Sequence, residues 1–230
     1  MTSERGSKAL ASEGTVDSWL KHIIDALAVP GLLVGHRVIS EGDELALLDE
    51  EMDSFSLPAI ERRRASGAAR RLARELMNSM GAGNLPIPRS KFGTPIWPEE
   101  IVGSIAHDNQ VAVAAVGLRR DLSAVGIDIE PAEPLPPDIL ELVATSQEQR
   151  AIVGNQLGAK LLFVIKEAVF KATYPLDHRF LDFHDIEVDL DNRFAITRTG
   201  RTLALRWGVL SHVAVVATIR NTSMDDLASD

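Results

Sequence analysis

The stretch VAVAAVGLRRDLSAVGIDIE, residues 111–130, predicts two buried strands joined by a charged turn. The runs 111–116 and 124–129 are apolar except for one carboxylate, Asp128, near the end of the second run. Side chains two residues apart in a strand leave the same face, so Asp128 and Glu130 point to one side. A proline-rich loop follows and ends the strand. We therefore expect two oxygen donors side by side at a strand end.

Helical patterns lie on both sides of these strands. An arginine-rich region from about 58 to 80 has apolar residues at helical spacing before a glycine-rich breaker. A second helical region is expected from about 147 to 173. Its predicted boundaries are Thr145 or Ser146 as the N-cap, a break near 154–158, and Pro175 as the stop. On its last helix Glu167 and Lys171 are four residues apart and share a face.

Three further strands are expected from the alternation at 186–190 and 203–207 and from the apolar run at 213–219. The segment VAVVAT at 213–218 resembles VAVAAV at 111–116, and helix-then-strands order occurs twice. Short valine and alanine strands are common, so this similarity arises either by chance or from a true repeat. A true repeat would make the protein two similar α/β halves with a ligand cleft between them.

The expected division of the chain has four parts. They are a disordered N-terminus at 1–15, an N-terminal half at 16–123, a C-terminal half at 124–220 and a flexible tail at 221–230. A chain of 230 residues is long enough for such a pair of packed halves.

Composition narrows the possible chemistry. The absence of cysteine excludes disulfides, thiolate metal sites and a cysteine nucleophile. The net charge of −9 argues against general nucleic-acid binding, and no apolar stretch predicts a membrane span, so we expect a cytoplasmic protein. Residues 61–91 are an exception, with eight basic side chains against two acidic ones, which suggests a small anionic ligand.

Three carboxylates on two elements indicate a cation. Asp128 and Glu130 on the strand and Glu167 on the helix could approach one another only if a cation neutralised them. An all-oxygen set that leaves room for water and phosphate is typical of Mg²⁺. The simpler alternative for Glu167 and Lys171 is a solvated ion pair on a helix face. The remaining helix arginines, Arg63, Arg64, Arg71 and Arg74, are either a solvated face or contacts to an acidic partner.

Four motifs occur in a fixed order: the arginine-rich helix, WPEEIVGSIAH at 97–107, GIDIE at 126–130 and FVIKEAVFK at 163–171. Together they resemble the surfactin-type 4′-phosphopantetheinyl transferases, the branch that also includes the enterobactin-synthetase enzyme. The resemblance covers roughly residues 58–220. It implies an α+β fold of two similar α/β halves related by a pseudo-twofold, with coenzyme A bound in a cleft at their interface. It implies transfer of the 4′-phosphopantetheine group of coenzyme A to a serine of an apo acyl or peptidyl carrier protein, with release of adenosine 3′,5′-bisphosphate.

The resemblance also implies roles for individual residues. It makes Asp128, Glu130 and Glu167 the Mg²⁺ ligands, and Glu167 and Lys171 the catalytic pair, with Glu167 as the expected base and Lys171 on the pyrophosphate. The expected contacts to coenzyme A are Arg62, Arg70, Arg89 or Lys91, Ser104, His107, Lys166 and Lys171.

Two other functions would use the same residue types: a Mg²⁺-dependent nucleotide phosphohydrolase and a nucleotide-binding regulator without catalysis. The expected partners are coenzyme A and an apo carrier protein, with neither nucleic acid nor membrane, and the protein is expected to be a monomer. The pathway served could concern fatty acids, polyketides, peptides or siderophores.

Overall fold

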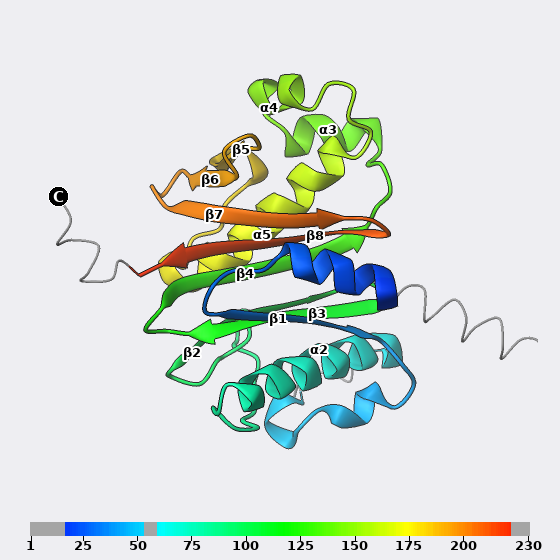
Figure 1. Cartoon of the computed structure of the whole chain (residues 1–230), viewed down its shortest axis with the longest axis vertical. Helices are drawn as coiled ribbons and strands as arrows, with labels where there is room; N and C mark the ends of the chain where they lie inside the picture. The colour runs from blue at the N-terminus through cyan, green and yellow to red at the C-terminus, as the bar shows by residue number, and fades with distance from the viewer. Residues whose placement is uncertain (1–16, 53–58, 222–230) are drawn as a thin grey trace, which may run out of the picture.

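A computed structural model describes residues 17–52 and 59–221, which form two antiparallel sheets, each covered by a long helix (Figure 1). The expected disordered start at 1–15 and all but the first residue of the expected tail at 221–230 lie outside the described residues. The mixed helix and strand content confirms the predicted α+β class.

The first sheet has the strand order β1-β3-β2 and carries α2 on one face. Its elements are β1 (Leu32–Val38), β2 (Ile101–His107), β3 (Val111–Leu118) and α2 (Ile60–Ser79), with the 3-10 helices η1 (Asp43–Ala46) and η2 (Asp49–Glu51) between β1 and α2. Ala114 and Val116 of β3 pack against Leu72 and Met77 of α2. Val113, on the opposite face of β3, enters a different core. Burial on both faces explains why the strand is apolar throughout.

The second sheet has the order β4-β8-β7-β6-β5 and carries α5. Its elements are β4 (Leu122–Pro131), α3 (Pro137–Val143), α4 (Ser146–Ala151), α5 (Gly158–Asp177), η3 (Phe183–Asp185), β5 (Ile186–Asp189), β6 (Phe194–Thr197), β7 (Thr202–Val209) and β8 (His212–Arg220). In register, Asp128 lies opposite Val215 and Glu130 opposite Val213. Since Val213 and Val215 pack in the α5 core, the carboxylate pair belongs to the α5 side of β4.

One apolar core joins the two sheets. It contains Val113 of β3, Ile127 of β4 and Val216 of β8, together with Leu20 and Ile23. The last two lie on an N-terminal helix, residues 17–26, which crosses the front of the molecule where the sheets meet (Figure 1). The two halves therefore share a core.

The elements differ from the sequence expectation at several points, since the N-terminal helix at 17–26 and α3 were also not predicted. The structure adds β1, β2 and β6, which the sequence did not predict. Pro175 was wrongly expected to end its helix: α5 continues to Asp177, and His178 caps it in the left-handed region with φ 50°. A proline this close to the C-terminus removes only one N–H bond of the final turns. Thr145 does cap α4, since its side chain accepts a bond from the Glu148 amide.

The two similar valine and alanine segments become β3 and β8, and each has a partner strand on both sides in its sheet. That placement agrees with an internal repeat, although the pseudo-twofold stays a prediction. Among residues 17–52 and 59–221, no helix is long and apolar enough to cross a membrane.

Candidate active site

The predicted carboxylate pair lies where β4 meets α5. Gly126 allows this close approach, because a Cβ atom added there would lie 1.8 Å from the carbonyl oxygen of Ala168 in α5. Two residues later, Asp128 is buried beneath the helix, and Glu130 is partly exposed at the strand end. The glycine of the GIDIE motif thus sets the distance between the strand carboxylates and the helix.

The facing side of α5 carries Lys160, Glu167 and Lys171, spaced by about two turns and then one turn. The Lys171 Nζ atom donates to Asp128 Oδ1 at 2.7 Å. The Lys160 Nζ atom lies 3.7 Å from Glu130 Oε2. Lys171 therefore pairs with the strand carboxylate, and the alternative of a solvated pair with Glu167 is not what the structure shows. The site combines three carboxylates with two ammonium groups.

Electrostatics confirm that the three carboxylates lie in one environment. Burial, first of all, raises the pKa of Asp128, Glu130 and Glu167 above the ordinary carboxyl range. The charge of Asp128 further raises the pKa of both glutamates. A divalent cation would relieve this repulsion, and carboxylate oxygens are the donors that Mg²⁺ prefers. The donor set therefore fits Mg²⁺.

The side chains are not gathered around one point, however. Within the two described segments, no group of three histidine, aspartate or glutamate side chains could enclose a metal ion as placed here. Instead Asp128 is drawn to Lys171 and Glu130 lies nearest Lys160. The assignment of Asp128, Glu130 and Glu167 as metal ligands stays a prediction, which requires these carboxylates to exchange lysine for metal.

A cavity of about 620 Å³ adjoins Lys171 and lies between the two halves. Its walls come from α2, the loop at 89–97 and β2 of the first half, and from α5 of the second. The predicted coenzyme A residues on its lining are Arg62, Arg70, Arg89, Ser104, His107 and Lys171. A volume of this size suits a small organic ligand, and the basic lining suits an anionic one.

His107 ends β2 at the rim of this cavity. Its pKa is lowered, chiefly by burial and also by the positive charges of Lys171 and Arg70. An N–H of this imidazole can donate a hydrogen bond to an anion in the cavity. The same electrostatic coupling indicates that His107, Lys171 and Arg70 act on one region of space, although they come from β2, α5 and α2.

Two predicted contacts do not line the cavity. Lys91 is absent from its lining, and its Nζ atom lies 4.9 Å from the centre of the Phe92 ring. Arg89 does line the cavity, and its Nε atom donates to Gly93 O at 3.0 Å. Between the two residues left open by the sequence, the structure favours Arg89.

Lys166 is the second exception and a correction. Its side chain is fully buried, and its Nζ atom donates to Glu148 Oε2 at 2.7 Å and to the carbonyl oxygens of Val143 and Phe183 at 2.9 Å each. These three bonds use all three N–H groups of the ammonium. Lys166 therefore ties α5 to α3, α4 and η3, does not line the cavity, and has no donor left for a phosphate.

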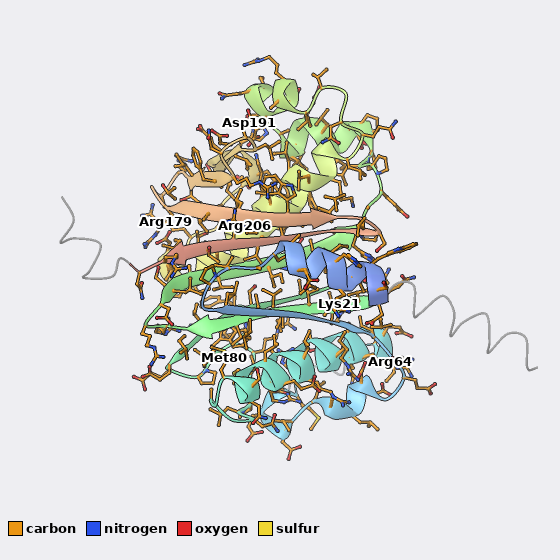
Figure 2. All side chains as sticks on the ribbon, viewed as in Figure 1. Lys21, Arg64, Met80, Arg179, Asp191 and Arg206 are labelled. Carbon is orange, nitrogen blue, oxygen red and sulfur yellow. The ribbon has the colours of Figure 1, made fainter. Side chains whose placement is uncertain are left out.

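Most of the other helix arginines contact acidic residues within the chain. Arg64 extends from α2 toward η1, where its Nε donates to Glu44 at 3.0 Å (Figure 2). Arg71 pairs with Glu75 on the same helix. Arg74 is buried and pairs with Glu51 at 2.6 Å. Acidic side chains of the protein thus neutralise part of the basic charge at residues 61–91. The basic side chains of this region that line the cavity are Arg62, Arg70 and Arg89.

Sequence reasoning missed Lys160 and the aromatic residues Trp97, Phe170 and Tyr174 of the cavity wall. Lys160 precedes Glu167 by seven residues, so helical spacing could have identified it once Glu167 was chosen. The aromatic residues carry no such signal, because their contribution depends on how α5 meets β2.

We expect Glu167→Gln to raise the melting temperature of the metal-free protein at pH 8. The pKa of Glu167 is raised in the folded state, so the folded protein binds its proton more tightly than the unfolded chain and loses stability as pH rises through that pKa. The glutamine variant lacks this loss. Its advantage should disappear near pH 4, close to the ordinary glutamate pKa of about 4.3. Thermal melts in EDTA measure it, with Glu99→Gln, at an exposed position, as the control.

A lower melting temperature for Glu167→Gln at pH 8 would contradict the desolvated, repulsive environment described for this carboxylate. Added Mg²⁺ should reduce the difference in melting temperature between Glu167→Gln and wild type. The reason is that a bound cation stabilises the wild-type carboxylate group more than it stabilises the neutral variant.

Lys166→Met should destabilise the protein by about 3 to 5 kcal/mol, because it leaves the buried Glu148 carboxylate without its partner. Urea unfolding measures the loss, and Lys21→Met on the exposed face of the N-terminal helix is the control. Below the unfolding transition, affinity for coenzyme A should stay close to wild type. Unchanged stability with weakened coenzyme A binding would return Lys166 to the phosphate-binding set.

Comparisons with known proteins identify the family of this chain. The family model for the 4′-phosphopantetheinyl transferase N-terminal domain matches residues 51–117 of this chain. The family model for the 4′-phosphopantetheinyl transferase superfamily matches residues 124–220. The 4′-phosphopantetheinyl transferase PptT of Mycobacterium tuberculosis is 31% identical over 159 residues, which are 67% of this chain and 70% of that protein. This chain belongs to the 4′-phosphopantetheinyl transferase family.

Other members of the family are also similar. The 4′-phosphopantetheinyl transferase Svp of Streptomyces mobaraensis is 35% identical over 158 residues, 65% of this chain and 63% of that protein. Enterobactin synthase component D of Salmonella typhimurium is 28% identical over 195 residues, 72% of this chain and 81% of that protein. The chain therefore spans less than two thirds of the Streptomyces relative. The 4′-phosphopantetheinyl transferase match to residues 124–220 covers both Asp128 and Glu167.

Proposed function

We propose that this protein transfers the 4′-phosphopantetheine group of coenzyme A to a serine of an apo carrier protein. The observation that carries the proposal is the position of Lys171. It pairs with Asp128 of the carboxylate group and also lines the basic cavity that holds His107 and Arg70. A metal-binding group and an anion-binding cavity thus share one side chain, as a reaction at a pyrophosphate requires.

The proposed reaction is a single displacement at phosphorus. The carrier serine oxygen forms a bond to the β-phosphorus of coenzyme A, and the bond from that phosphorus to the bridging oxygen breaks. Adenosine 3′,5′-bisphosphate leaves with the electron pair. Glu167 accepts the serine proton, directly or through water.

Asp128, Glu130 and Glu167 are the residues that would hold Mg²⁺, which supplies charge neutralisation at the phosphates when bound. Lys171 stabilises the charge that grows on the leaving pyrophosphate oxygen. Arg62, Arg70 and Arg89 orient the nucleotide end. A monomeric enzyme in the cytoplasm, acting without nucleic acid or membrane, is part of the same proposal.

Mass spectrometry of the carrier tests this function. The protein is mixed with coenzyme A, Mg²⁺ and apo carrier proteins from fatty-acid, polyketide, peptide and siderophore synthesis. The proposal predicts that at least one carrier gains the mass of one phosphopantetheine group. Release of phosphate from a nucleotide without any carrier would instead favour a phosphohydrolase.

His107→Ala should weaken binding of coenzyme A more than binding of dephospho-coenzyme A. A hydrogen bond to a charged phosphate contributes about 1.5 to 3 kcal/mol, so the difference should be roughly 10- to 100-fold. Calorimetry with both ligands measures it, with His22→Ala on the exposed N-terminal helix as the control. Equal losses for both ligands would show that His107 does not contact the 3′-phosphate.

A further inference from the structure

A buried contact between a carboxylate and a histidine joins the two halves. Asp108 follows β2 in the first half, and His212 begins β8 in the second. The His212 Nε2 atom lies 3.0 Å from Asp108 Oδ2, and both side chains are more than nine-tenths buried. Neither residue belongs to the carboxylate group or to the cavity lining described above.

Asp108 is held rigidly on its own side. Its Oδ1 atom accepts hydrogen bonds from the backbone amides of Gln110 and Val111, each at 2.7 Å, and so fixes the turn between β2 and β3. Its Oδ2 atom makes no well-aligned hydrogen bond within the described segments, so the close approach of His212 is what compensates this buried charge. The attraction of His212 contributes to a pKa of Asp108 that is lowered despite its burial.

His212 is held on the other side. Its Nδ1 atom lies 3.0 Å from Ser211 Oγ, and its backbone stands opposite Pro131 in the β4–β8 pair. Pro131 directly follows Glu130. The backbone of His212 is therefore paired with the strand end that carries Glu130, and Ser211 holds its ring.

Each residue of the pair lies close to a residue of the proposed site. His107 directly precedes Asp108, and its side chain lines the cavity. Glu130 directly precedes Pro131, which lies opposite His212 in the β4–β8 pair. The charge of Asp108 contributes to the raised pKa of Glu130. At the far end of β8, Arg220 and Asn221 hydrogen-bond to backbone carbonyls of Pro30, Arg119 and Arg120, which joins the halves away from the site. The Asp108–His212 pair joins them at the site end.

We propose that Asp108 and His212 form a positioning pair that fixes the turn carrying His107 against the strand end carrying Glu130. The inference rests on the proposed function, because it concerns how the cavity and the carboxylate group are kept in register. A shift of about 1 Å between reacting groups can cost on the order of 100-fold in rate. An ion pair across the interface restrains the halves against such a shift more specifically than their shared apolar core does.

The test uses Asp108→Asn and His212→Phe separately and together. Asparagine keeps the acceptor for the turn and removes the charge, and phenylalanine keeps the ring and removes its nitrogens. Each single variant should lower kcat/KM for coenzyme A roughly 10- to 30-fold and weaken coenzyme A binding several-fold in calorimetry, at a temperature where circular dichroism shows a folded protein. The double variant should lose no more than the worse single variant, because the two residues act as one unit.

His212→Gln is the conservative variant, since its amide can still donate toward Asp108, and it should recover part of the loss. It also carries the test if His212→Phe does not fold. His22→Phe is the matched control at an exposed histidine. Wild-type kinetics and binding in Asp108→Asn, or fully multiplicative losses in the double variant, would overturn the proposal.

Failure of the proposed function looks different. In that case the wild-type protein modifies none of the carriers, while calorimetry still reports whether Asp108 and His212 affect coenzyme A binding. A melting temperature that falls in both variants with unchanged coenzyme A affinity and unchanged kcat would assign the pair a purely structural role and overturn the inference.

Discussion

Asp128→Asn and Glu130→Gln are each expected to lower carrier modification by more than about 1,000-fold, which corresponds to roughly 4 kcal/mol in the barrier. Both replacements are close in shape to the original side chain, so neither leaves a cavity. Each removes an anionic oxygen from the set that is proposed to hold Mg²⁺. Initial rates of carrier modification over a Mg²⁺ titration measure the effect.

The two variants should differ in stability. Asp128 is buried with Lys171 at 2.7 Å, so the asparagine variant leaves a partly buried ammonium without its anion. Glu130 is more exposed, and its carboxylate suffers from burial and from the charge of Asp128, so the glutamine variant should be at least as stable as wild type. Near wild-type rates in either variant at limiting Mg²⁺ would contradict the metal assignment.

Lys171→Ala should lower kcat by roughly 30- to 1,000-fold, or about 2 to 4 kcal/mol, because its ammonium stabilises charge that grows on the leaving group. Lys171→Arg should recover only part of this loss. A planar guanidinium is wider than an ammonium and cannot approach a phosphate as a compact point charge. Steady-state kinetics of the two variants, with saturating Mg²⁺ and carrier, make the comparison.

The contact to Asp128 refines this expectation. If Lys171 served only to neutralise Asp128, Lys171→Met would affect stability and leave kcat nearly unchanged once Mg²⁺ occupies the carboxylates. Unchanged turnover in Lys171→Ala would therefore move this lysine out of the reaction, and the account of how cavity and carboxylates are linked would be wrong. Lys91→Ala, which does not line the cavity, is the matched lysine control.

Much of the carboxylate site was predictable because its spacing is local. Asp128 and Glu130 share a strand face, and Glu167 and Lys171 share a helix face, so periodicity alone placed each pair correctly. The pairing of Lys171 with Asp128 was not predictable from periodicity. It depends on how closely α5 approaches β4, which is set by the contact of Gly126 with Ala168.

Lys166 shows the opposite case. Its neighbour Glu167 faces the site, and adjacent helical residues point about 100° apart, so Lys166 faces elsewhere. The chain closes that other side with Glu148, which lies in the short helix α4 capped by Thr145. Lys166 and Glu167 are adjacent in the sequence motif, but the helix directs their side chains to different sides. The strands β1 and β6 were missed for a similar reason, since short strands gain their stability from partners distant in sequence.

One experiment with a single carrier and three proteins tests whether Asp128 and Lys171 serve phosphopantetheine transfer. An apo carrier that the wild-type protein modifies is incubated with coenzyme A and Mg²⁺ and with wild type, Asp128→Asn or Lys171→Ala, and intact mass is followed over time. We expect rapid addition of one phosphopantetheine group by wild type, slow addition by Lys171→Ala and almost none by Asp128→Asn. Equal rates of addition by all three proteins would contradict the proposed roles of Asp128 and Lys171.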